Sequence, residues 1–168
     1  MTEEFVQKIN VVEGFLPVDL QTGANDGDWV SLRNYHNCAV VFVSAIGTAA
    51  DDPTLTLQQA TDVAGAGVKD LDFTVIHRKQ AATDLTGTGT WTRTTQTAAN
   101  TFTNATSAEE DLIWIVDFVD MELDAANDFD CLRATVANIG GNAQLGYLFY
   151  ALYNPRVAQA TLLSAIVD

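Results

Sequence analysis

The stretch Trp29–Gly65, WVSLRNYHNCAVVFVSAIGTAADDPTLTLQQATDVAG, decides the fold class of this chain. Its second half, Thr54–Ala60, alternates in polarity: Leu55 and Leu57 would lie on one side of an extended strand, and threonine and glutamine side chains on the other. A period of two is typical of a strand with one dry face and one wet face. The segment therefore predicts a strand at the surface of a sheet.

The first half of the stretch has a different pattern. Residues Ala39–Ile46 are apolar almost throughout, which predicts a strand that is buried on both sides or lies against another subunit. A polar connector containing Asp51, Asp52 and Pro53 joins the two halves. Strands of these two kinds fit best in a two-layer β-sandwich.

Length and composition are those of one folded domain. The chain has 168 residues, of which 48% are hydrophobic and 18% are charged. A domain of this size buries enough surface to fold without disulfides or a structural metal. We expect no membrane partner, because no apolar run approaches the roughly 20 residues that span a bilayer. The start, MTEEFVQKIN, lacks the order of a secretory signal, so synthesis in a cytoplasm is expected.

The charge balance argues against nucleic acid as a partner. The chain has 22 Asp and Glu residues but only 8 Lys and Arg residues, for a net charge of −14. Nucleic-acid binding requires clustered cations that neutralise phosphates. The acidic excess favours solubility and would suit a partner with a basic patch.

About eight strands can be expected, separated by turn residues. They are rich in β-branched and aromatic side chains: Trp29–Leu32, Ala39–Ile46, Thr54–Ala60, Phe73–Lys79, Trp91–Thr95, Leu112–Val119, Cys131–Ala137 and Gln144–Tyr153. This pattern predicts an all-β, antiparallel β-sandwich of jelly-roll type. Ala98–Glu110 is interpreted as a long surface loop, and Met121–Phe129 as a turn or short helix.

The last strand is the most aromatic part of the chain. Both of its faces are apolar, so it is expected to be central in its sheet. The domain organisation that follows is an N-terminal strand or arm at residues 1–18, a sandwich domain at 19–156, and a tail or short helix at 157–168. The two terminal segments are too apolar to remain in water, and each would dock on its own domain or on another subunit. We expect these segments to supply the interface with another subunit or partner: Phe5, Ile9, Val12, Phe15, Leu162, Leu163, Ile166 and Val167.

The sequence offers no catalytic constellation. His36 is placed in a turn and His77 in an exposed strand position beside two cations, which is not the arrangement of a metal or acid–base site. No serine lies in a GxSxG elbow and no glycine-rich segment continues into a phosphate loop. Cys38 and Cys131 are interpreted as buried thiols without CxxC spacing. We therefore expect no enzyme activity and no cofactor.

Carboxylates are the one abundant reactive group. Six acidic residues fall between Asp117 and Asp130, and a second acidic group surrounds Asp26 and Asp28. Paired carboxylates can hydrolyse glycosides, and loop carboxylates can bind calcium. Neither segment has the spaced D-x-D-x-D-G pattern of a calcium loop, and solvation of a turn is the simpler interpretation.

Three segments resemble small virion proteins of tailed bacteriophages. They are Asp28–Tyr35, Pro53–Val63 with the glycines that follow it, and Ala143–Arg156. The resemblance implies a non-enzymatic virion protein of head-gene type, most often a decoration (cement) protein on the outside of the capsid. It also implies a homo-oligomer, with a trimer expected from the family, and the major capsid protein as partner.

Two other functions remain open. A tail, neck or tube component belongs to the same class of virion proteins, and an acidic surface would let DNA slide past it. A jelly-roll carbohydrate-binding module belongs to a different class and would use a surface aromatic as a stacking platform. The candidates are Trp29, Trp91 and Trp114. Trp114 lies inside an apolar strand, and Trp91, flanked by threonines, is the one expected to be exposed.

Overall fold

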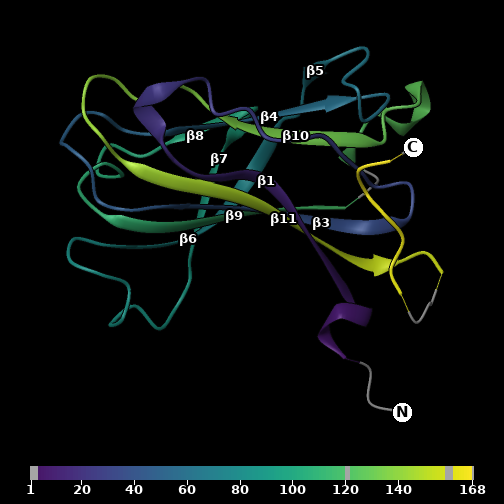
Figure 1. The fold of residues 1–168 in the computed structure, drawn as a ribbon, viewed down its shortest axis with the longest axis horizontal. Coiled ribbons are helices and arrows are strands. Elements are labelled where there is room, and N and C mark those ends of the chain that lie inside the picture. The colour runs from purple at the N-terminus through teal and green to yellow at the C-terminus, as the bar shows by residue number, and fades with distance from the viewer. Residues whose placement is uncertain (1–3, 120–121, 158–160, 168) are drawn as a thin grey trace.

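The computed structural model describes residues 4–119, 122–157 and 161–167. Two antiparallel sheets lie face to face, one above the other in Figure 1, and form a β-sandwich. The expectation of an all-β sandwich is confirmed. The described helices are single 3-10 turns, η1 (Phe5–Gln7), η2 (Leu20–Thr22) and η4 (Ala125–Asn127), and none of them could cross a membrane.

One sheet has six strands and the other has five. The six-stranded sheet has the order β1 (Ile9–Asp19), β11 (Leu145–Pro155), β3 (Tyr35–Ser44), β9 (Asp111–Val119), β6 (Phe73–Ala81) and β7 (Thr92–Ala99). The five-stranded sheet has the order β2 (Val30–Ser31), β10 (Cys131–Val136), β4 (Thr54–Ala60) and β5 (Lys69–Asp70), with β8 (Thr101–Thr103) also paired to β4. All eight strands expected from the sequence are present, with some shifts at their ends.

The pairing of the long strands is nested. β3 pairs with the last strand β11, β4 pairs with β10, and β6 pairs with β9, all antiparallel. Pairing of early strands with late strands across the whole chain is typical of Greek-key and jelly-roll sandwiches. As a result, β3 and β11 lie next to each other inside the six-stranded sheet, with β1 on one side and β9, β6 and β7 on the other.

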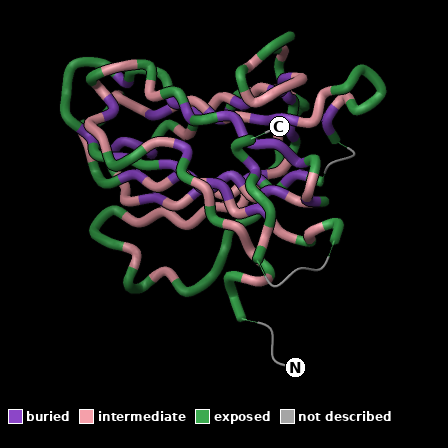
Figure 2. The backbone as a smooth tube through the Cα atoms, turned by 45° about the vertical axis from the view of Figure 1, so that its right-hand side comes forward, coloured by how far each residue is buried: buried purple, intermediate pink, exposed green. Residues whose placement is uncertain are grey.

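The core lies between the two sheets, where Figure 2 shows the buried residues gathered. Alternate residues of the facing strands point into it, as the burial patterns of β4, β9 and β10 show. Trp114 is fully buried and contacts two aromatic rings, with centroid distances of 5.7 Å to Phe42 and 4.9 Å to Phe102. The expectation that Trp114 belongs to the core is confirmed.

Both terminal segments dock on their own domain. The N-terminal segment forms β1, which pairs with β11 along the edge of the six-stranded sheet. In the tail, Ala165 is buried and its carbonyl accepts a hydrogen bond of 2.7 Å from the backbone of Ser31. The hydroxyl of Tyr35 donates to the carbonyl of Leu163. Residues 161–165 therefore cover the end of the core beside β2 and β3.

Two local expectations are wrong. The segment Ala98–Glu110 is not a loop throughout, because β8 lies in it and Phe102 of β8 packs against Trp114. Its threonines and asparagines are typical of a loop, but the apolar side chain of Phe102 anchors a short strand that pairs with β4. His36 lies in β3 and not in a turn. In Met121–Phe129, Met121 lies outside the described residues and η4 provides the expected helical turn.

Candidate functional site: an uncovered apolar sheet face

The two outer faces of the sandwich differ in polarity. On the five-stranded sheet, β4 points its leucines into the core and Thr54, Thr56 and Gln58 outward. Arg133 and Thr135 of β10 share that outer side. This face is wet, as the alternating sequence of β4 predicted.

The outer face of the six-stranded sheet is apolar in its middle. Leu148, Tyr150 and Leu152 of β11 point into the core, so the odd-numbered residues of that strand point outward. The registers of β1, β3 and β9 place further apolar side chains beside them. We name this surface the outer apolar face and define it by its members: Val11, Ala39, Val41, Val43, Ile113, Ile115, Tyr147, Phe149 and Ala151.

Solvent exposure is concentrated on this sheet. Among the described residues, five large apolar side chains that lie in strands are more than a third exposed, and each belongs to β1, β9 or β11. Val11 and Tyr147 belong to the outer apolar face and Leu16, Val119 and Leu145 lie at its margins, whereas Val41 in its middle is only 7% exposed. Monomeric proteins rarely expose contiguous apolar patches of more than a few hundred Å². An apolar sheet face of this kind is typical of a surface that another macromolecule covers.

Side chains within the outer apolar face are ordered by contacts with one another. The rings of Tyr147 and Phe149 stack at a centroid distance of 6.2 Å. At one end of the sheet, the hydroxyl of Tyr153 lies 2.7 and 2.6 Å from the two carboxylate oxygens of Asp117. Burial, together with the Asp117 carboxylate, raises the pKa of the Tyr153 hydroxyl. The hydroxyl therefore stays protonated and serves as the donor for the one acidic side chain in this part of the face.

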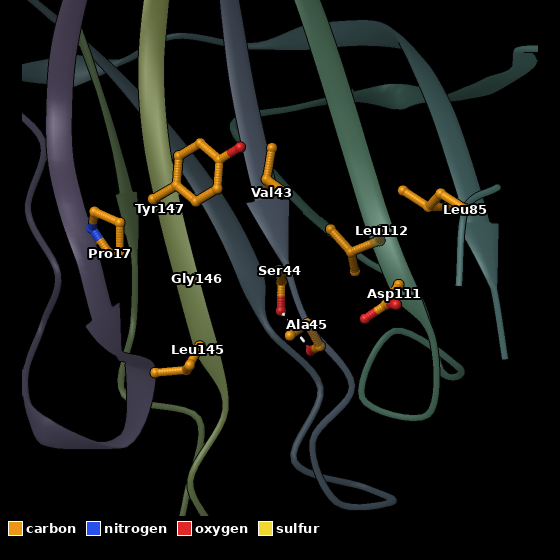
Figure 3. Close-up of a pocket in the computed structure, with 10 residues that line it drawn as sticks. All are labelled: Pro17, Val43, Ser44, Ala45, Leu85, Asp111, Leu112, Leu145, Gly146 and Tyr147. Carbon is orange, nitrogen blue, oxygen red and sulfur yellow. Dashed lines mark hydrogen bonds between the residues drawn. The ribbon is translucent and has the colours of Figure 1, made fainter. Parts of the chain in front are cut away.

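A groove of about 420 Å³ continues the outer apolar face at the other end of the strands. Tyr147 and Val43 line its floor, Pro17 of β1 lies at one side, and Leu85 from the β6–β7 connection lies at the other (Figure 3). Asp111 also reaches the groove, and its carboxylate accepts a hydrogen bond of 2.9 Å from the backbone of Ile46. That contact fixes the chain where it leaves β3. The groove is large enough to accept one or two apolar side chains of a partner.

Cations border the face on the side of β6 and β7. Register places His77 beside Ile115 on β9 and beside Arg93 on β7, and Lys79 beside Ile113. The ammonium of Lys79 lies 4.8 Å from the centroid of the Trp91 ring, a cation–π contact. Glu13 lies at the opposite side, on β1 next to Phe149.

The interface residues expected from the sequence fall into two groups in the structure, those buried against their own chain and those exposed to solvent. Val12, Phe15 and Leu162 are partly buried against the core of their own chain, because β1 and the tail dock in cis. Ile9 is partly exposed beside Tyr153. The exposed members are Phe5, Leu163, Ile166 and Val167. Figure 1 shows η1 beyond one end of the six-stranded sheet, on the side away from the other sheet.

The reactive groups singled out in the sequence have structural partners. Cys38 and Cys131 are buried thiols, and the Sγ of Cys131 donates a hydrogen bond of 3.1 Å to the carboxylate of Asp130. Burial raises the pKa of Cys38. Asp124 accepts hydrogen bonds from Lys69 and Asn127, and these contacts lower its pKa. Glu122 accepts a hydrogen bond of 2.7 Å from the backbone of Val119. Within residues 4–119, 122–157 and 161–167, no group of three or more His, Cys, Asp or Glu side chains is placed to hold a metal ion.

Sequence reasoning missed the outer apolar face as a site, although its signal was present. The strands at Ala39–Ile46 and Gln144–Tyr153 are apolar on both sides, and the sandwich covers only one side of each. The second side of each strand therefore carries apolar side chains that the core of the sandwich does not use.

Comparison with known proteins gives little for this chain. No protein-family model and no curated protein sequence matches it. Among solved structures, the SPBc2 prophage-derived protein YomS is similar over 86% of this chain and 92% of that one, with a TM-score of 0.46 and 10% identity.

Proposed function

We propose that the chain is a non-enzymatic structural protein of a tailed-phage particle, attached to the outside of the head as a decoration protein. The observation that carries the proposal is the outer apolar face: a rigid sheet surface that is apolar where an independent soluble protein would be polar. The reason for placing the chain in a phage particle is the resemblance to virion proteins of three segments, Asp28–Tyr35, Pro53–Val63 and Ala143–Arg156.

The division of polarity between the two sheets supports a protein with one side that is covered in the assembled particle and one side that is free. The five-stranded sheet presents threonine and glutamine side chains to water, and the six-stranded sheet presents the apolar side. A chain with a charge of −14 outside a DNA-filled shell has no phosphate to bind and is repelled by free nucleic acid. The partners in this proposal are further copies of the chain and the major capsid protein.

The non-enzymatic part of the proposal is supported by what the candidate carboxylates do. Asp117 binds Tyr153, Asp124 binds Lys69, and Glu122 binds the backbone of Val119. Each of these contacts ties one part of the fold to another. Both carboxylate oxygens of Asp117 are engaged in this way, which supports a structural role for that side chain.

The proposal is tested on purified particles. Quantitative mass spectrometry should find the chain in stoichiometric amounts, and immunogold labelling should place it over heads. Labelling confined to tails would transfer the assignment to a tail, neck or tube component. Absence of the chain from particles would refute both.

Exposure of Trp91 supports one alternative from another class, a carbohydrate-binding module. Its side chain is 44% exposed, whereas Trp114 is fully buried and Trp29 is nearly so. Lys79 lies over the Trp91 ring and occupies one of its faces. Binding of labelled oligosaccharides that is lost in Trp91→Ala would favour this function over a virion role.

A further inference from the structure

We infer that the outer apolar face packs against the same face of a second copy of this chain. The two copies would be related by a two-fold axis that lies between their six-stranded sheets and runs parallel to the strands. The inference deepens the proposed function and rests on its homo-oligomer, because it names the surface through which copies associate. This surface is not the one expected from the sequence, which placed the interface on the terminal segments.

The first support is one row of residues that crosses all six strands in register. Glu13 on β1 is followed by Phe149, Val41, Ile115, His77 and finally Arg93 on β7. The row thus has an acid at one end, apolar side chains in the middle, and His77 followed by the cation Arg93 at the other end. If two such rows lie against each other in opposite directions, the acid of each meets the cation of the other and the apolar side chains meet in the middle.

Face-to-face packing around the stated axis produces that reverse. A two-fold axis parallel to the strands keeps the direction along each strand and exchanges the β1 edge with the β7 edge. Glu13 of each copy then faces Arg93 of the other, and the apolar centres of the two faces meet. Isologous interfaces of this kind are the commonest in homo-oligomers, and aligned sheets pack about 10 Å apart at an angle of about 30°.

The second support is that the three middle rows of this face carry no net charge, although the molecule is strongly acidic. Three successive register rows, from Val11 through Glu13 to Tyr147, contain two acids, Glu13 and Asp117, and two cations, Lys79 and Arg93. The charge of −14 therefore arises from residues outside these rows. Two copies that meet here avoid the repulsion that other faces of the molecule would impose.

The third support is area. Leu145 to Tyr153 extends about 27 Å along β11, and six strands extend about 24 Å across the sheet, at the usual spacings of a β-sheet. The whole outer side of the six-stranded sheet, with the outer apolar face in its middle, therefore measures about 650 Å² per copy, or about 1,300 Å² in a pair, an area comparable with that of stable protein interfaces.

Charge exchange tests the inference directly. Sedimentation equilibrium of the full chain should give a dimer whose dissociation constant rises about tenfold or more at low salt in Glu13→Lys and in Arg93→Glu, because each reversal places two like-charge contacts in the pair. The combined variant Glu13→Lys/Arg93→Glu should restore association close to that of the unmodified chain. Asp70→Arg, an exposed reversal on the five-stranded sheet, is the matched control and should leave the dimer unchanged.

Three outcomes would overturn the inference: a monomer at every concentration, a trimer, or a dimer that neither single reversal weakens. Circular dichroism of each variant separates loss of association from loss of fold. Mass spectrometry of particles separates this inference from the proposed function. If the chain is present in particles but its association is unchanged by the reversals at Glu13 and Arg93, the virion role stands and only the two-fold contact is refuted.

Discussion

Tyr150 connects the two sheets through a single hydrogen bond. Its side chain crosses the core from β11, and its hydroxyl accepts a hydrogen bond of 2.9 Å from the backbone N–H of Ala134 on β10. Gly27 lies over this contact, since a Cβ there would be 2.6 Å from the hydroxyl and 2.5 Å from the carbonyl oxygen of Ala134. A side chain at residue 27 would therefore displace one of the partners.

Replacement of Tyr150 by phenylalanine is expected to lower the free energy of unfolding by about 1–3 kcal/mol, because the buried N–H of Ala134 loses its partner. Urea denaturation monitored by tryptophan fluorescence measures the change. Tyr147→Phe removes a hydroxyl from the outer apolar face and should change stability by less than about 0.5 kcal/mol. Equal effects of the two substitutions would show that the hydroxyl of Tyr150 contributes nothing to the fold.

The same residue makes stability sensitive to alkali. Burial raises the pKa of Tyr150 far above the unfolded value of about 10. A group with a raised pKa contributes its full stability below the unfolded pKa, and that contribution declines as the pH rises above it. The free energy of unfolding should therefore fall above a pH of about 10, and less steeply in Tyr150→Phe than in the unmodified chain. Burial also raises the pKa of Tyr35 and Tyr153, so part of the decline should remain in the variant.

At the scale of elements, the C-terminal tail belongs to the fold of its own chain. Ser31 and Tyr35 both donate hydrogen bonds to tail carbonyls, and Leu162 packs against the core. A chain ending at Val157 is expected to lose about 2 kcal/mol or more of stability, since these donors lose their partners and apolar surface becomes exposed. Thermal denaturation measures this loss.

Ile166→Ala is the control for the truncation. Its side chain is 52% exposed, so the substitution should change stability by less than about 0.5 kcal/mol. If the truncated chain is as stable as the full one, the tail contacts are of no energetic importance. The tail would then be available to a partner, as the sequence allowed.

The strands show how far sequence pattern alone could reach. The alternation in β4 predicted both its core side and its wet side, because one leucine in two defines a single register. Ala39–Ile46 and Gln144–Tyr153 predicted cover on both sides, but periodicity does not say whether the second cover comes from the same chain or from another. β8 was missed because Thr101–Thr103 has the composition of a loop and only Phe102 anchors it.

The same limit applies to the candidate site. The terminal segments were expected to form the interface because their apolar residues had no visible place in the sandwich. Val12, Phe15 and Leu162 found that place through long-range pairing and docking, which local pattern does not contain. The outer apolar face emerged only when register placed residues of β1, β3, β9 and β11 side by side.

For the whole molecule, the central claim is that the outer apolar face is covered in the assembled state. The native thiols make a chemical test simple, because Cys38 and Cys131 are both fully buried. A new cysteine can be placed at Ala151 on the outer apolar face, and a matched one at Thr56 on the wet face. Both positions are partly exposed in the single chain and lie on inner strands of their sheets.

Thiol labelling of assembled particles containing these variants is the most direct measurement. Ala151→Cys should react at least about tenfold more slowly than Thr56→Cys in the particle, and the two should react alike once the protein is unfolded, because only a covered sheet face excludes the reagent. Equal labelling of both cysteines in the intact particle would mean that the outer apolar face remains open to solvent, and would contradict its role in assembly.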